Sequence, residues 1–369
     1  MVRSILAYVT ADASAPTLRF GLIGSGLAGP LFGGAMAQRP AGARLDAIAT
    51  RHEASAREAG ERWGARRWYD DWRRLVEDPE IDAVCIATPT GTHAEIAIAA
   101  AQLGKHVLTE KPMATTLADA DRMIAACDAA GVTLGVIFMY RFMDTARKIK
   151  QAVDAGRLGR PLLGECIGKF LRTQAYYDSG EWRGTWSGEG GGALMTQTSH
   201  TLDLLLWILG DVAQVAGFWT TTPVHQIEVD DLAVATLRFR SGALGSIVSS
   251  SAIQPPSDRV LRIHGERGTV ALVGDRIGSW EIPGDDPDAA AMHAEAPSDR
   301  GDTTARAGYA DPELHRRQIE DFVRAVLDGR RPQIDGREGR RTLEVMRAIF
   351  LANDRRAVVE LPVEEEALR

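Results

Sequence analysis

A histidine closes a glycine-rich stretch that reads GGGALMTQTSHTLD at residues 190–203. Consecutive glycines let a backbone approach another group closely. The imidazole of His200 titrates near neutrality and therefore suits proton transfer in both directions, although a core histidine satisfied by backbone groups is the alternative. The nearest acids are Glu189 and Asp203. Asp203 would share a helical face with His200 and could orient its ring, or it could cap the helix or form a salt bridge there.

A second glycine-rich stretch lies near the start of the chain and has the pattern GxGxxG. In this pattern the first glycine permits a tight turn, the second admits a pyrophosphate and the third allows close helix–strand packing. The helix that follows supplies backbone donors and a positive dipole end. The stretch predicts a dinucleotide-binding turn made of Gly24, Ser25, Gly26, Leu27, Ala28 and Gly29.

The choice of dinucleotide depends on the end of the second expected strand. An acid about twenty residues after the glycines would bind the adenosine ribose of NAD(H). Here the strand ends in Thr50 and Arg51, and Asp46 lies too early. A hydroxyl followed by a guanidinium suits a 2′-phosphate. The sequence therefore favours NADP(H), with NAD(H) possible and an ordinary surface arginine as the alternative.

The elements that position these residues alternate in the first third of the chain. Helical patterns separate nearly continuous apolar runs, which is typical of a parallel sheet covered on both faces. The runs expected to be strands lie at 17–26, 43–50, 83–90, 105–112 and 132–140. They predict a Rossmann dinucleotide-binding domain at residues 17–140 of an α/β protein, preceded by a loose extension at residues 1–16.

The pattern changes in the remainder, residues 141–369, which we assign to an α+β domain for substrate binding and oligomerisation. A strand at 161–172 and a helix around 197–209 come first, and further strands then follow in succession. They are expected at 215–223, 231–239, 243–252, 258–265 and 268–274, with turns at Ser241-Gly242 and at Glu266 to Gly268. This succession predicts an open, mostly antiparallel sheet with the connections of a meander. An aperiodic segment at 283–310, two helices and a short strand near the C-terminus complete the prediction.

Composition narrows the functional classes. The chain has 369 residues, 45% hydrophobic and 25% charged residues and a formal charge of −7, which argues against nucleic-acid binding. Its three cysteines are widely spaced and suggest neither disulfides nor a metal site. No apolar run is long enough to span a membrane, and the apolar core of the N-terminal segment is too short for a signal peptide. A cytoplasmic location is expected.

Together with these features, further motifs identify a family resemblance. They are ATPTGTH at 87–93, TEKPMA at 109–114, YRF at 140–142, GRLGRPL at 156–162, WRGTW at 182–186 and LPV at 361–363. In this order and spacing the chain resembles the Gfo/Idh/MocA family of oxidoreductases. The resemblance implies a Rossmann domain, a second sheet domain whose outer face forms a homodimer or homotetramer, and nicotinamide-dependent chemistry on a small-molecule sugar or cyclitol.

The resemblance also implies residue roles. Lys111 would lie beside the nicotinamide and polarise the substrate hydroxyl, and His200 would act as general acid or base. Glu110 would pair with Lys111 or contact the cofactor. Cofactor contacts are also expected from Thr88, Pro89 and His93, although His93 could be a residue at a helix N-terminus without a ligand.

One position departs from the family pattern. Many members have an Asp four residues before the histidine, where this chain has Thr196 followed by Gln197. A threonine supplies no charge, but it can exchange a hydrogen bond with a substrate hydroxyl. We therefore expect Thr196 at the catalytic site, and both Thr196 and Gln197 in contact with the substrate.

The segment before the glycines adds further substrate candidates. Arg183 could bind an anionic or carboxamide group, and Trp182 and Trp186 could stack on a sugar face or pack between domains. Tyr140 and Arg141 have the same two interpretations. Two other functions stay open, namely oxidoreduction of a dihydrodiol or another carbonyl compound and a non-catalytic nucleotide-sensing regulator.

Overall fold

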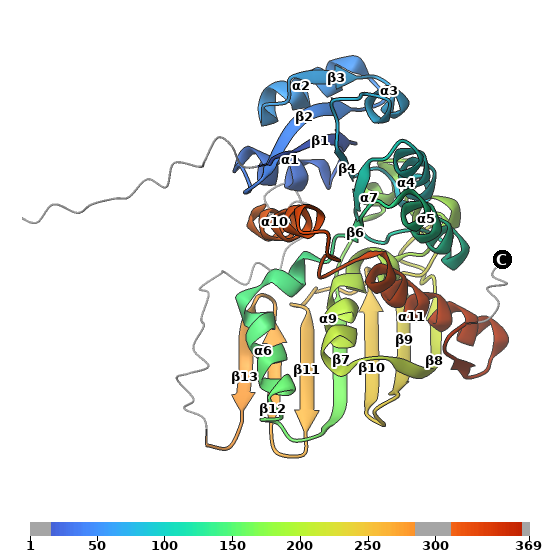
Figure 1. Cartoon of the computed structure of the whole chain (residues 1–369). Helices are drawn as coiled ribbons and strands as arrows, with labels where there is room; N and C mark the ends of the chain where they lie inside the picture. The colour runs from blue at the N-terminus through green and yellow to red at the C-terminus, as the bar shows by residue number, and fades with distance from the viewer. Residues whose placement is uncertain (1–15, 285–310, 364–369) are drawn as a thin grey trace, which may run out of the picture.

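The computed structural model describes residues 16–284 and 311–363. The extension predicted at 1–16 and the segment at 283–310 therefore fall almost entirely outside the described residues. The described strands form two sheets, which lie one above the other in Figure 1.

The first sheet has six strands in the order β3-β2-β1-β4-β5-β6, all paired in parallel. The strands are β1 (Leu18–Ile23), β2 (Ala43–Ala49), β3 (Arg67–Tyr69), β4 (Ala83–Ile86), β5 (His106–Thr109) and β6 (Leu134–Val136). This order confirms the predicted Rossmann domain. The strand order reverses direction between β1 and β4, and a crevice for a ligand forms at that point in sheets of this kind.

Helices cover both faces of this sheet. They are α1 (Gly29–Ala37), α2 (Glu53–Trp63), α3 (Trp72–Val76), α4 (His93–Gln102) and α5 (Leu117–Ala130), with the short 3₁₀ turns η1 (Thr90–Thr92) and η2 (Met139–Phe142). Every residue of β4 is buried, as expected for a central parallel strand. Sequence reasoning missed β3, because its three half-buried residues carry no continuous apolar run.

The second sheet has eight strands in the order β13-β12-β11-β7-β10-β9-β8-β14. They are β7 (Pro161–Lys169), β8 (Val212–Thr220), β9 (Leu232–Phe239), β10 (Leu244–Ser250), β11 (Val260–Gly265), β12 (Thr269–Val273), β13 (Arg276–Glu281) and β14 (Val359–Glu360). Neighbours pair antiparallel except for β7 with β10, so the mostly antiparallel prediction is confirmed.

The predicted meander is wrong at one place. β7, the first of these strands in the chain, lies between β10 and β11 and runs parallel to β10. In this central position both edges of β7 form hydrogen bonds, which a hairpin between β10 and β11 would prevent. The turns predicted at Ser241-Gly242 and before Gly268 do connect antiparallel neighbours.

Three helices, α6 (Asp144–Asp154), α9 (Ser199–Leu209) and α11 (Gly336–Arg355), cover one face of the second sheet (Figure 1). The remaining helical segments are α7 (Gln174–Asp178), α8 (Trp186–Glu189), the π-helical η3 (Leu194–Thr198) and α10 (Glu313–Leu327). Helix α10 is late in the chain, yet it packs against α1 and η2. It therefore brings a distant part of the sequence to the boundary between the sheets.

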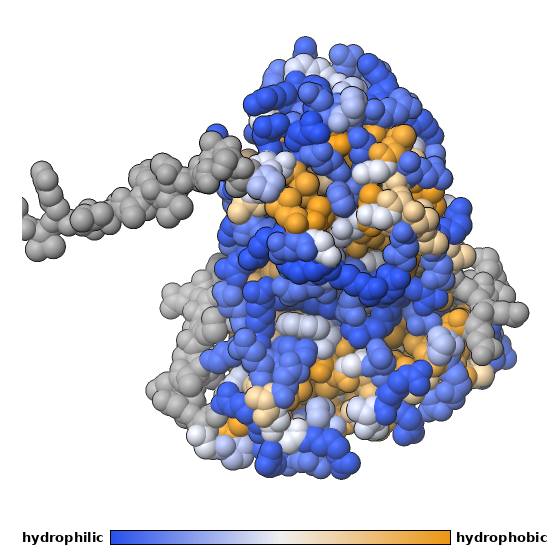
Figure 2. All heavy atoms as spheres, viewed as in Figure 1, coloured by the Kyte–Doolittle hydropathy of each residue, from blue (hydrophilic) through white to orange (hydrophobic). Residues whose placement is uncertain are grey.

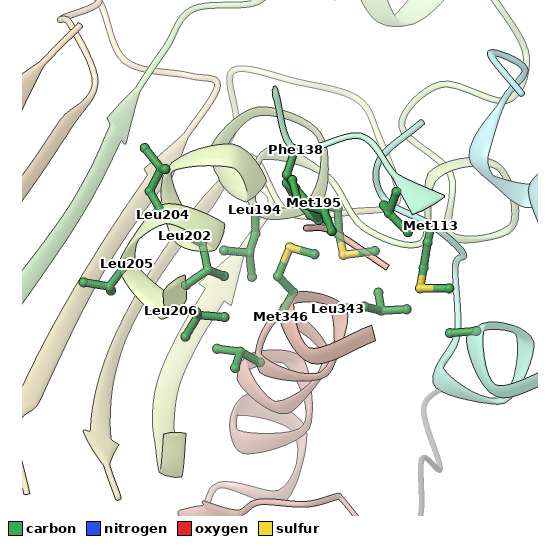
Figure 3. Packing of buried hydrophobic residues seen from close by; sticks show 14 of the residues in the cluster. Met113, Phe138, Leu194, Met195, Leu202, Leu204, Leu205, Leu206, Leu343 and Met346 are labelled. Atoms are coloured by element: carbon green, nitrogen blue, oxygen red, sulfur yellow. The ribbon is translucent and has the colours of Figure 1, made fainter. Parts of the chain in front are cut away.

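The core beneath α9 fixes the segment that carries His200. Helix α9 is buried along almost its whole length. In Figure 3, Leu202 and Leu206 lie toward α11, whereas Leu205 points away from it, and a Cβ on Gly164 of β7 would lie 2.5 Å from the Leu205 side chain. The labelled side chains there include Leu194, Met195, Leu202, Leu204, Leu205, Leu206, Leu343 and Met346. Each such burial contributes about 1.5–3 kcal/mol. This packing holds α9 in one position.

The opposite face of the second sheet has no covering helix in the described residues. Along β9, buried and exposed residues alternate, and large apolar side chains are exposed at Phe218, Val234 and Leu244. Figure 2 shows the molecule from the same direction as Figure 1. The surface on that side is mostly hydrophilic, with scattered hydrophobic patches. Within the described residues, no helix combines the length and apolar character needed to cross a membrane.

Candidate functional site

A pocket with a volume of about 1980 Å³ contains nearly all of the predicted site residues. It extends from the glycine-rich turn after β1, past the ends of β2 and β4, to η3 and α9. The predicted residues that line it are Gly24, Ser25, Gly26, Leu27, Ala28, Thr50, Arg51, Thr88, Pro89, His93, Glu110, Lys111, Trp182, Arg183, Thr196, Gln197 and His200. Of the predicted site residues, Gly29 lies outside the lining. The structure brings all the others together in this pocket.

The glycine-rich turn has the geometry that its sequence pattern predicts. Gly24 has a φ of 97°, and a Cβ atom on it would lie 2.6 Å from the carbonyl oxygen of Ala87. A Cβ on Gly29 would lie 2.9 Å from the oxygen of Gly24, which explains the third glycine by helix–strand packing. The turn precedes the N-terminus of α1 and fits a pyrophosphate.

The far end of the pocket carries charges of both signs. Arg51 is exposed there, whereas the Thr50 hydroxyl donates to the backbone oxygen of His52 at 2.7 Å. Asp70 and Asp71 line the same end, and Asp70 forms an ion pair with Arg74. Sequence reasoning missed both acids, because they follow β3, the strand that it also missed.

His93 is buried at the start of α4, with carbonyl oxygens at both ring nitrogens. Its Nδ1 lies 3.0 Å from the oxygen of Pro112, and its Nε2 lies 2.9 Å from the oxygen of Thr88. Burial lowers the pKa of this imidazole. The ring therefore joins the loops that carry Thr88 and Lys111.

Lys111 reaches across the pocket to the second part of the chain. Its Nζ donates to the backbone oxygen of Thr196 at 2.7 Å, and burial lowers the pKa of the ammonium group. Glu110 accepts from the backbone N–H of Lys111 at 3.1 Å. The other carboxylate oxygen of Glu110 lies 3.1 Å from Nε2 of His315, on α10. Because 205 residues separate this pair, no local pattern in the sequence could reveal it.

His200 lies at the inner end of the pocket, and its side chain is almost completely buried. Its Nδ1 has no hydrogen-bond partner among the described residues. The ring packs against Tyr140, with ring centres 4.6 Å apart, and edge-on against Phe138. Burial and the nearby Lys111 charge hold the pKa of His200 well below its ordinary value. The imidazole is therefore neutral at pH 7.

Asp203 does not orient this ring, so that interpretation is wrong. Its carboxylate is fully buried and binds the guanidinium of Arg141 at 2.6 and 2.8 Å. Arg141 also donates to Glu338, at 2.8 Å. The salt bridge considered for Asp203 exists, but it joins α9 to η2 rather than residues within one helix. Arg141 is thus structural, whereas Tyr140 lines the pocket.

The residues in the place of the family aspartate lie in η3. The Thr196 hydroxyl donates to the oxygen of Gly192 at 2.8 Å, so this group can only accept a further hydrogen bond from a ligand. Gln197 donates to the same hydroxyl oxygen at 3.3 Å and accepts from Arg172 at 2.9 Å. The π-helical winding, which is frequent at functional sites, was not expected from the sequence.

Aromatic rings and guanidinium groups form the outer wall. The guanidinium of Arg183 lies 4.4 Å from the ring centre of Tyr176 and 4.3 Å from that of Trp182. Arg259 lies 4.0 Å from the ring centre of Tyr140. Trp186 is not in the lining and packs against Trp219 and Phe350, which supports the packing interpretation. The lining residues Arg172, Tyr176, Glu189, Arg259 and His315 were absent from the predicted site.

Comparison with protein-family models identifies both parts of the chain. Residues 18–138 match the model described as the oxidoreductase family with an NAD-binding Rossmann fold. Residues 146–271 match the Gfo/Idh/MocA C-terminal domain.

Named relatives agree with these matches. Myo-inositol 2-dehydrogenase of Thermotoga maritima is 30% identical over 88% of this chain and 93% of its own length. The structure of the WlbA dehydrogenase of Bordetella pertussis, in complex with NADH and UDP-GlcNAcA, is 33% identical with a TM-score of 0.81, covering 94% of this chain and 100% of that chain. A levoglucosan dehydrogenase structure with NADH and L-sorbose is 26% identical with a TM-score of 0.81, covering 94% and 100%.

Proposed function

The chain belongs to the Gfo/Idh/MocA family of oxidoreductases, and we propose that it transfers hydride between a nicotinamide dinucleotide and a ring carbon of a sugar, sugar derivative or cyclitol. One observation carries this proposal: Lys111 and the neutral His200 line the same pocket as the glycine-rich turn. The names of the relatives, among them myo-inositol 2-dehydrogenase and levoglucosan dehydrogenase, support the substrate class.

The residues of the chain supply binding and proton transfer. The turn from Gly24 to Gly29 fits the pyrophosphate of the dinucleotide, whose nicotinamide when bound accepts or donates the hydride. A hydride leaves a carbon only as the hydroxyl proton departs. The neutral imidazole of His200 can take that proton, and the ammonium of Lys111 can stabilise the developing alkoxide. In the reverse direction, protonated His200 returns the proton to the oxygen.

Within this function we assign substrate contacts to four further residues. Trp182 and Arg183 would face the substrate from the outer wall, and Gln197 and Thr196 from η3. Because the proton of the Thr196 hydroxyl is engaged by Gly192, a substrate hydroxyl would donate to Thr196 rather than accept from it.

For the cofactor we propose NADP(H). The exposed Arg51 at the end of β2 supports this choice, because its guanidinium can pair with a 2′-phosphate. NAD(H) is the second candidate, supported by Asp70 at the same end of the pocket and by the NADH complexes of the relatives.

Fluorescence titrations with NADPH and with NADH test the cofactor assignment. Arg51→Ala is expected to weaken NADPH binding about 10- to 100-fold, as for the loss of a charge-assisted contact, and to leave NADH binding unchanged. Arg57→Ala, an exposed arginine of α2 outside the pocket, is the control. Equal losses for both dinucleotides would exclude the 2′-phosphate contact.

A turnover screen of sugars and cyclitols with the bound cofactor then tests the function. Reduction of the dinucleotide by at least one ring alcohol is expected. Tight cofactor binding without any turnover would favour the sensor interpretation.

A further inference from the structure

Two arginines of the outer wall converge on one tyrosine ring. The guanidinium of Arg172 lies 5.0 Å from the ring centre of Tyr176, and that of Arg183 lies 4.4 Å from it. Both guanidinium groups line the pocket. Both positive charges therefore border the same region of the pocket, where a bound anion would offset them.

Arg183 has no ion pair among the described residues. Its Nε is buried without a hydrogen-bond partner, and the contacts of its guanidinium are the rings of Tyr176 and Trp182. Arg141, the structural arginine of the same chain, is instead neutralised by the carboxylates of Asp203 and Glu338. A guanidinium held in a pocket without such a partner is suited to a ligand anion.

The nearest buried acid does not fill this role. Glu189 lines the same wall, but it accepts a hydrogen bond from the backbone N–H of Gly184 at 2.6 Å rather than forming an ion pair with Arg183. Burial raises its pKa to about 7, so a large part of its charge is absent at neutral pH. Glu181, the other acid of this wall, is exposed to solvent.

The backbone at Arg172 is fixed by buried residues. The backbone oxygen of Arg172 lies 2.9 Å from Nε2 of His225, whose Nδ1 lies 2.8 Å from Asp231. The guanidinium also donates to Gln197, which in turn contacts Thr196, the residue that binds Lys111. Hydrogen bonds therefore link Arg172 through Gln197 and Thr196 to Lys111, the residue proposed to meet the reacting hydroxyl.

We propose that Arg172 and Arg183 form an anion-binding subsite, so that the substrate is an anionic sugar carrying a carboxylate or a phosphate. This inference rests on the proposed function and specifies its substrate class. The planar guanidinium of Arg183 would bind the anion through paired N–H donors, and the rings of Tyr176 and Trp182 would hold it in place.

The experiment measures ligand binding to the NADPH-saturated protein by calorimetry, and in a separate assay the reduction of NADP⁺ by each probe. The probes are glucuronate and glucose 6-phosphate, with glucose as the neutral counterpart. At least one anionic probe is expected to bind about 10- to 100-fold more tightly than glucose. Comparison of the dissociation constants of glucuronate and glucose 6-phosphate identifies the preferred anion as a carboxylate or a phosphate.

Arg183→Gln is expected to weaken binding of the preferred anionic probe about 10- to 100-fold more than binding of glucose, and so to remove the preference. Arg183→Lys, which keeps the charge, should restore part of it, and Arg57→Gln is the matched control on the surface of α2. Equal binding of charged and neutral probes, or an unchanged preference in Arg183→Gln, would overturn the subsite. If glucose were nevertheless oxidised, the proposed function would stand. Anion binding without turnover of any probe would instead count against the proposed function alone.

Discussion

Burial, rather than a carboxylate partner, sets the protonation of His200. The acid three residues later pairs with Arg141, and no charged group of the described residues stabilises the imidazolium. The cation of Lys111 lies near enough to disfavour a second positive charge. The site therefore keeps the imidazole neutral, which is the state that its proposed role as a base requires.

This protonation state predicts the pH profile of oxidation. The base form of His200 is needed, and because its pKa is depressed, that form persists below the ordinary value of about 6.5. We expect kcat/KM for oxidation to lose no activity to His200 protonation between pH 8 and about 6.5. Glu189, with a pKa of about 7, titrates in the same pocket, so the profile is measured in Glu189→Gln as well. An acid limb at or above pH 6.5 in that variant would contradict the depressed pKa.

Glu189 itself predicts a pH dependence of stability. Burial raises its pKa in the folded protein from 4.5 to about 7, so between these values the folded state binds the proton and the unfolded state does not. The contribution of Glu189 to the free energy of unfolding therefore falls by on the order of 3 kcal/mol as the pH rises from 4.5 to about 7. Above this window the contribution is constant.

Denaturant unfolding at pH 5 and pH 8 tests this dependence. Glu189→Gln keeps an acceptor for the N–H of Gly184 but cannot ionise. The free energy of unfolding should therefore decline less between the two pH values in the variant than in the wild type. The same decline in both proteins would exclude Glu189 as the source.

The site residues that could be predicted from the sequence are those that belong to local patterns. The glycine turn, Lys111 and His200 stand in motifs whose spacing is readable from the chain. His315 and the Arg141–Asp203 pair depend on segments that meet only in the folded protein. The sequence also suggested that Asp203 orients His200, whereas in the folded protein Asp203 pairs with Arg141.

Among the elements, η3 depends on the glycines before it. Asp230 accepts from the backbone N–H groups of Gly192 and Leu194 at 2.6 and 2.9 Å, which caps the start of this segment. A Cβ atom on Gly192 would lie 1.8 Å from the backbone oxygen of Asp230. The glycine run before the histidine therefore allows the backbone at Gly192 to approach the backbone at Asp230 closely.

Gly192→Ala is accordingly expected to destabilise the fold by about 3 kcal/mol or more, since the clash is with backbone rather than a flexible side chain. Gly60→Ala on α2, where a Cβ would meet no atom closer than 3.5 Å, is the control and should be neutral or slightly stabilising. Thermal unfolding of both variants measures the difference. Equal melting temperatures would show that the segment can relax around the added methyl group.

The sequence predicted element types better than their connections. Five of the six parallel strands were readable because they lie in nearly continuous apolar runs, and the alternation along β9 indicated a sheet with one buried face. The insertion of β7 between β10 and β11 was not readable, because strand neighbours are selected by edge pairing and by packing under α9 rather than by local sequence.

For the whole molecule, the uncovered face of the second sheet supports the predicted homodimer or homotetramer. Phe218 is paired in register with Val234, and both side chains are exposed on adjacent strands. Apolar side chains gathered on one uncovered face are typical of a surface that another subunit covers.

Phe218→Asp is therefore expected to shift the protein to a smaller species in light scattering coupled to size-exclusion chromatography. A charge at a covered apolar position costs several kcal/mol in desolvation. Leu103→Asp, at an exposed position after α4, is the control. A wild-type protein that is already monomeric would refute the predicted assembly.

One pocket is lined by the glycine-rich turn and by both proposed catalytic residues, Lys111 and His200. The most direct test is the kcat of His200→Ala on a substrate that the wild type oxidises, with the dissociation constant of NADPH measured in parallel. We expect kcat to fall about 10²- to 10⁴-fold while NADPH binding is unchanged. Turnover at the wild-type rate would contradict the assignment of His200 as the base.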